Sequence, residues 1–145
     1  MTEHTKKQGL YRPFPNDTIS VMHDGQAAKI SLYGIDAPER EQAFGNRAKQ
    51  FVSTLAFGKE VKVEVKYQDR YGRTVANVIL PDERNLNREI VKVGFAWWFR
   101  KYAPKDKVIE GLESEARAAK RGLWADREPV PPWDYRALMR QGQSR

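Results

Sequence analysis

Two carboxylates, Asp36 and Glu39, stand on either side of Pro38 in the stretch Leu-Tyr-Gly-Ile-Asp-Ala-Pro-Glu-Arg, residues 32–40. Pro38 has a fixed φ and drives Ala37 toward extended geometry, so the loop is stiff. A stiff loop of this kind can hold a hard cation and a water-activating base close together. Because Asp and Pro are also common turn residues, a polar surface turn is the alternative interpretation.

A β-hairpin is predicted immediately before this loop. Residues 18–22 and 28–32 have the alternation of half-buried strands, and the Asp-Gly pair at residues 24–25 favours a tight turn between them. Antiparallel pairing would bring Asp17, at the start of the first strand, beside the exit of the second strand. We therefore expect Asp17 to lie near Asp36.

The rest of the chain alternates strand and helix patterns. Strands are predicted over residues 61–67 and 74–80, and helices over residues 46–57, 86–93 and 105–120. The less regular segments begin with a polar, mobile tail at 1–8 and an edge strand at 9–15. Further along are a short strand or extended segment at 95–99, an anchor at Trp133 and one or two helical turns at 134–140. These elements indicate an α+β fold, with about three α-helices on a five-stranded OB-like β-barrel.

Composition narrows the class of function. The 145 residues suit one domain, and the net charge of +7 favours a polyanionic partner such as nucleic acid, although a generic basic surface would give the same balance. Without cysteine, disulfides, zinc–thiolate sites and a cysteine nucleophile are excluded. No apolar run reaches the length of a membrane span, so we expect no membrane partner. No signal peptide is visible in the polar first residues, and a secreted or periplasmic location stays open if a signal was removed.

Four segments stand out along the chain: Asp-Thr-Ile at 17–19, Leu-Tyr-Gly-Ile-Asp-Ala-Pro-Glu at 32–39, Asp-Arg-Tyr-Gly-Arg at 69–73 and Arg-Gly-Leu-Trp at 121–124. In their order and spacing they resemble the staphylococcal nuclease (thermonuclease) family between about residues 9 and 124. The resemblance implies an OB-fold barrel with three helices and calcium-dependent cleavage of phosphodiester bonds in DNA and RNA, in single-stranded or unwound regions, by a monomer. It covers a nuclease-like domain at 9–125 and leaves a C-terminal extension at 126–145.

The resemblance also implies a role for individual positions. Asp17, Asp36 and the Ala37 backbone carbonyl match calcium ligands, Glu39 a general base, Arg73 an arginine that binds the scissile phosphate, and Tyr102 an aromatic residue near the bound nucleotide. Several of these side chains could instead have a purely structural role. Glu39 could pair with Arg40 or Arg73, Arg73 could be a solvated hairpin charge, and Tyr102 need not contact a base. Trp97, Trp98 and Phe99 could stack on bases, but we predict that at least two pack in the core.

Two positions depart from the family pattern. Pro15 and Asn16 stand where the family has Asp and Gly, and Ser31 stands where the family has a second phosphate-binding arginine. A serine hydroxyl is short, neutral and a single donor, so the prediction is a nuclease with reduced turnover. The alternative is a catalytically impaired module that only binds nucleic acid or protein.

Overall fold

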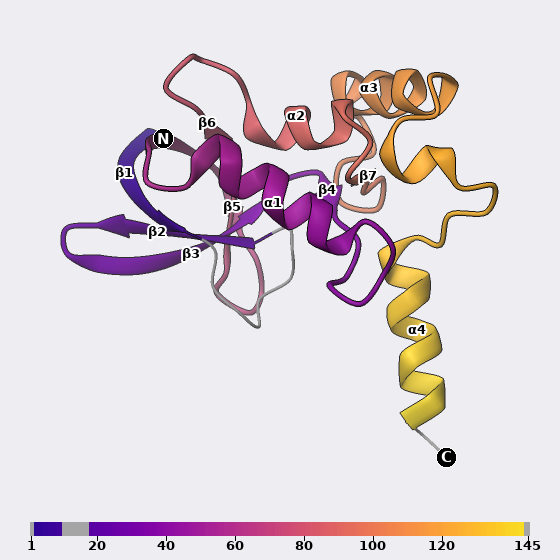
Figure 1. Ribbon diagram of the computed structural model, residues 1–145. Coiled ribbons are helices and arrows are strands. Elements are labelled where there is room, and N and C mark those ends of the chain that lie inside the picture. Colours follow the sequence, from indigo (N-terminus) through magenta and orange to yellow (C-terminus); the bar gives the residue numbers. More distant parts are fainter. Residues whose placement is uncertain (1, 10–17, 144–145) are drawn as a thin grey trace.

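Five strands close into a barrel in the computed structural model, which describes residues 2–9 and 18–143 (Figure 1). The strands are β1 (Thr2–Gly9), β2 (Thr18–His23), β3 (Gln26–Leu32), β5 (Glu60–Gln68) and β6 (Thr74–Ile79). Their order around the barrel is β1-β2-β3-β6-β5, antiparallel throughout except for the parallel pair β3–β6. The predicted α+β fold with a five-stranded barrel is confirmed.

The predicted hairpin forms β2 and β3. Ile19 pairs with Ile30, and both side chains are buried in the barrel core. Asp24 and Gly25 both have positive φ, at 50° and 77°, as a tight hairpin turn with right-handed twist requires. Thr18 pairs with Ser31, so the register runs to the end of the hairpin next to the carboxylate loop.

Strand β1 differs from the polar tail that the sequence predicts over residues 1–8. In the structure Lys6 pairs with Met22 of β2 and with Glu60 of β5, so β1 closes the barrel. Backbone hydrogen bonds to two neighbouring strands do not require apolar side chains, and a polar sequence therefore gives no warning of them. Most of the edge strand predicted at 9–15 lies outside the described residues.

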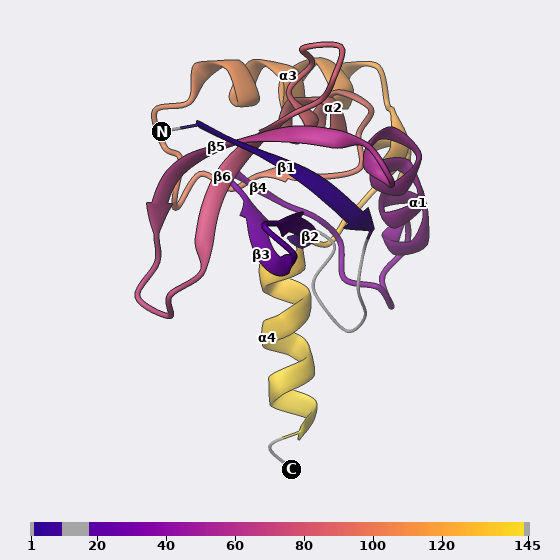
Figure 2. The same ribbon diagram turned by 90° about the vertical axis from the view of Figure 1, so that its left-hand side faces the viewer.

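Four α-helices are present in the described ranges: α1 (Gly45–Ala56), α2 (Leu86–Lys92), α3 (Lys107–Ala118) and α4 (Pro132–Gln143). Helices α2 and α3 cover one end of the barrel, whereas α4 projects from the opposite side (Figures 1 and 2). Helix α4 is longer than the one or two turns predicted there. None of the helices described here is long and apolar enough to cross a membrane.

A small two-stranded sheet fixes the carboxylate loop. Strand β4 (Ile35–Asp36) pairs with β7 (Trp97–Trp98), and the Phe99 N–H donates to the Gly34 carbonyl at 2.9 Å. Gly34 has φ of 79°, and a Cβ there would lie 2.7 Å from Ile109 Cδ1 in α3. The positive φ favours glycine, and a Cβ here would also displace the Ile109 side chain, so glycine lets the loop approach α3 closely.

Asn87 connects α2 to the barrel through its buried amide. The side chain is fully buried, its oxygen accepts from the Val78 N–H at 3.2 Å, and its NH₂ donates to the carbonyls of Tyr33 and Ala76 at 3.0 and 3.1 Å. The Val78 N–H and the Tyr33 carbonyl are therefore bonded by this amide, whereas the Ala76 carbonyl also accepts the Tyr33 N–H at 2.9 Å.

Replacing Asn87 with alanine is expected to lower the free energy of unfolding by about 3 kcal/mol or more, because each buried group left without a partner costs about 1–3 kcal/mol. Urea denaturation followed by tryptophan fluorescence measures the change. The matched control is Asn46→Ala, at an exposed position in α1. Equal stabilities for the two variants would contradict the bridging role.

Candidate functional site

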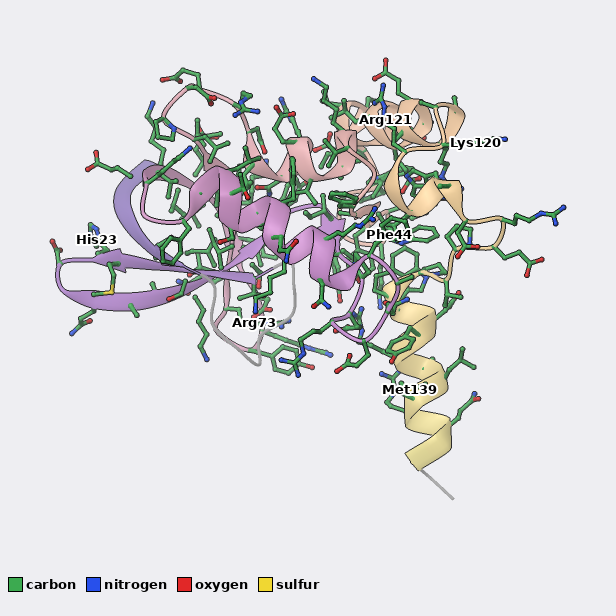
Figure 3. The ribbon with its side chains drawn as sticks, in the orientation of Figure 1. His23, Phe44, Arg73, Lys120, Arg121 and Met139 are labelled. Carbon is green, nitrogen blue, oxygen red and sulfur yellow. The ribbon has the colours of Figure 1, made fainter. Side chains whose placement is uncertain are left out.

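One cleft gathers most of the residues predicted to be functional. Its volume is about 1040 Å³, and its walls come from β3, β4, the β5–β6 hairpin, the segment after β7 and α4. Its lining includes Ser31, Asp36, Glu39, Arg73 and Tyr102. Arg73 lies on the side of the barrel from which α4 extends (Figure 3). The structure thus brings these five predicted residues together on one face of the barrel.

Asp36 is a buried carboxylate, with 2% of the residue exposed. Arg136 of α4 donates from Nη2 to its Oδ2 at 2.8 Å. Burial raises the pKa of Asp36, because it disfavours the charged form, and the Arg136 hydrogen bond and charge partly offset this increase. Burying a carboxylate in its charged form is costly unless it is paired, and Arg136 is its partner here.

Glu39 shares the same cation. Arg136 donates from Nη1 to Glu39 Oε1 at 2.6 Å. The sequence offered Arg40 or Arg73 as the ion-pair partner of Glu39, but the structure has Arg136 in that role. The Glu39 N–H donates to Gln42 Oε1 at 2.8 Å, which fixes the backbone that carries the carboxylate. Although burial alone would lower it, the two carboxylates hold the pKa of Arg136 above its ordinary value.

Arg73 is oriented by its own hairpin. Its Nε donates to Asp69 Oδ2 at 2.7 Å, while Asp69 Oδ1 accepts the backbone N–H groups of Tyr71 and Arg73, each at 2.9 Å. Burial opposes the effect, but these hydrogen bonds hold the pKa of Asp69 below its ordinary value. A guanidinium has five N–H donors, so the bond to Asp69 leaves donors for a ligand in the cleft.

Aromatic residues form another wall of the cleft. Tyr102 is 54% exposed and meets Phe99 edge to face at 4.9 Å, and Phe99 stacks on Trp133 of α4 at 5.3 Å. Trp97 and Trp98 are buried, so the prediction that at least two residues of 97–99 pack in the core is confirmed. Tyr102 offers an exposed ring on which a base can stack.

Sequence reasoning missed Arg136, although a signal was available. Trp133 is the predicted anchor of the C-terminal segment, and 134–140 the predicted helical turns. Residues three apart on a helix share a face, so the anchor places Arg136 toward the body of the protein. The sequence does not show that this face of the helix lies over Asp36 and Glu39.

The chemistry of the donors fits a hard cation. One guanidinium bonds both Asp36 and Glu39, so their oxygens converge to within the width of that group. Calcium prefers carboxylate and carbonyl oxygens. Ala37, whose backbone carbonyl is a predicted ligand, follows Asp36 directly but is buried and is not among the residues that line the cleft. Within residues 2–9 and 18–143 no cluster of three or more metal-ligating side chains is present, and Asp17, the third predicted ligand, lies outside these ranges.

The fold and the cleft define an OB-like α+β barrel protein with a mixed acidic and basic site. The staphylococcal nuclease homologue family model matches residues 29–126, and the chain belongs to this family. It is 43% identical over 127 residues to an "Uncharacterized endonuclease" of Escherichia coli, covering 88% of this chain and 82% of that protein. It is 40% identical over 136 residues to a "Micrococcal nuclease" of Shigella flexneri, covering 88% and 78%. "Protein ParB" of Escherichia coli matches at 40% identity over 136 residues, covering 88% and 77%.

Proposed function

We propose that this protein is a calcium-dependent nuclease that hydrolyses phosphodiester bonds of DNA and RNA. The observation that carries the proposal is the cleft in which two converging carboxylates, Asp36 and Glu39, lie among the arginines 70, 73 and 136. The carboxylates suit a metal ion and a base, and the arginines suit a phosphate. Family membership and the names of two of the three relatives, an endonuclease and a micrococcal nuclease, support the nuclease part of this proposal.

Each residue then has one task. Asp17, Asp36 and the Ala37 carbonyl hold calcium, which when bound neutralises charge on the phosphate. Glu39 takes the proton from a water aligned with the phosphorus, because a carboxylate on a fixed backbone can act as a general base. Arg73 binds the phosphate through charge-assisted hydrogen bonds, and Tyr102 contacts the adjacent base.

Calcium binding tests the metal part of this proposal. Asp36→Ala is expected to abolish or greatly weaken calcium binding measured by isothermal titration calorimetry, because the buried carboxylate is a direct ligand. Asp82→Ala, at an exposed turn, is the control and should bind as the parent does. Melting curves of both variants check that the fold is retained. Unchanged calcium affinity in Asp36→Ala would show that Asp36 is not a calcium ligand.

A second candidate is a catalytically impaired module that binds nucleic acid. Ser31 favours it, because it lines the cleft with a neutral hydroxyl where the family has an arginine. Cleavage of end-labelled DNA with calcium and with a chelator separates the candidates. Calcium-dependent products support the nuclease, and binding without products supports the module.

A further inference from the structure

Helix α4 lies outside the residues that the family model matches, and its Arg136 places a guanidinium group in the cleft. Arg136 lies ten residues beyond the end of that match, in the expected extension at 126–145. The helix is held by Trp133, which stacks on Phe99 and lies 5.6 Å from Trp97, ring centroid to ring centroid. Beyond this anchor α4 leaves the body of the protein (Figures 1 and 2). The docked end of α4 therefore reaches the site, whereas the far end does not.

The guanidinium of Arg136 is oriented but not enclosed. Its bonds to Asp36 and Glu39 use one N–H from each Nη, and three of its five donors remain. The Arg136 side chain is 37% exposed, whereas that of Asp36 is 3% exposed. The carboxylates thus hold one side of the guanidinium while the group still lines the open cleft.

A structural ion pair explains these contacts only in part. Such a pair accounts for Asp36, whose side chain is only 3% exposed, but the side chains of Glu39 and Arg136 keep 19% and 37% of their surface exposed and line the cleft. Ser31 in this wall has a neutral side chain, and Arg73 approaches from the separate β5–β6 hairpin with Asp69 as its partner. Arg136 is therefore a guanidinium bonded directly to the proposed base.

We propose that Arg136 binds the scissile phosphate together with Arg73, so that α4 completes the active site. This inference rests on the proposed nuclease function. Phosphate accepts guanidinium donors in a matched, two-pronged geometry, and a donor held in advance stabilises charge that develops in the transition state. A carboxylate has about four acceptor positions, so Asp36 can bond Arg136 and still ligate a cation.

The test compares Arg136→Met and Arg136→Lys with the parent. Loss of one preorganised donor is expected to lower the single-turnover rate on single-stranded DNA by about 10²–10³-fold in Arg136→Met. Arg136→Lys should also lose at least about tenfold, because an ammonium lacks the fork geometry of a guanidinium. Arg127→Met, which removes the same charge from an exposed part of the extension, should keep the parental rate.

Two further measurements separate phosphate binding from a structural role. Oligonucleotide affinity by fluorescence anisotropy, measured in a Glu39→Gln background to slow cleavage, should fall in Arg136→Met. Calcium affinity by calorimetry should stay equal or become tighter, because a positive charge beside Asp36 is removed. The chain has four tryptophans, so the difference in fluorescence between each variant and the same variant carrying Trp133→Phe isolates Trp133 and reports whether α4 remains docked.

A parental or higher rate in Arg136→Met, with tighter calcium binding, would overturn the proposal and make Arg136 a blocker of the cation site. If Arg136→Met does not fold, a parental rate in Arg136→Lys would overturn it equally. If the parent itself does not cleave DNA, the proposed nuclease function fails. The anisotropy measurement still decides whether Arg136 contacts phosphate.

Discussion

Replacing Glu39 with glutamine is expected to lower turnover by about 10²-fold or more, the usual range of a general base. The glutamine amide has nearly the same shape, and its oxygen can still accept from Arg136 Nη1, which now bonds Glu39 at 2.6 Å. Its backbone position stays fixed by Gln42. What the amide loses is the ability to take a proton from water. Initial rates of calcium-dependent hydrolysis of single-stranded DNA give the measurement.

The control for this variant lies on the same loop. Glu41 is exposed, and Glu41→Gln removes one negative charge two residues away from Glu39. It should keep the parental turnover, and calcium affinity should change little in either variant. Parental turnover in Glu39→Gln would rule out the base role and leave Glu39 as an ion-pair partner of Arg136.

Sequence patterns predicted those parts of the fold that depend on residues close together in the chain. The alternation around Ile19 and Ile30 predicted the hairpin, and the apolar periodicity predicted the helices that the structure has as α2 and α3. The cap of each of these helices is also local in sequence. Asn85 accepts from the Arg88 N–H at the start of α2, and Asp106 accepts from the Ile109 N–H at the start of α3. In each case one side chain satisfies a free N–H of the first turn. These features need no knowledge of distant contacts.

Other parts depend on partners that are far away in the sequence. Strand β1 is fixed by backbone pairing to β2 and β5, and its polar residues carry no periodic signal. The parallel pair β3–β6, where Leu32 pairs with Ala76, is likewise a property of barrel closure. Hydrophobic periodicity predicts which face of an element is buried, but not which element covers it.

The candidate site divides in the same way. Asp36 and Glu39 share one rigid loop, and Arg73 has its partner Asp69 four residues earlier, so both groups were visible locally. Arg136 is separated from Glu39 and Asp36 by 97 and 100 residues. The pairing of Asp17 with Asp36 stays a prediction. Arg136, the site residue that only the structure reveals, thus bears most on whether Ser31 lowers the turnover.

Ser31 and Arg136 line the same cleft from β3 and from α4, and this suggests a rescue experiment. From the sequence alone, Ser31→Arg should raise turnover by about 10²–10³-fold, because it restores a missing donor. If Arg136 already supplies that donor, Ser31→Arg in the parent should gain less than about tenfold. In the Arg136→Met background the same substitution should recover most of the lost rate.

The energetic coupling between Ser31→Arg and Arg136→Met shows whether the two positions serve the same phosphate. Two groups that perform the same task are strongly non-additive, whereas independent sites add. The single and double variants are compared by single-turnover cleavage, with Arg127→Met plus Ser31→Arg as the matched pair. A gain of about 10²–10³-fold from Ser31→Arg in the parent would mean that Arg136 does not reach the phosphate. Failure of Ser31→Arg to restore Arg136→Met, with α4 still docked, would mean that a guanidinium at residue 31 cannot replace the one that α4 provides.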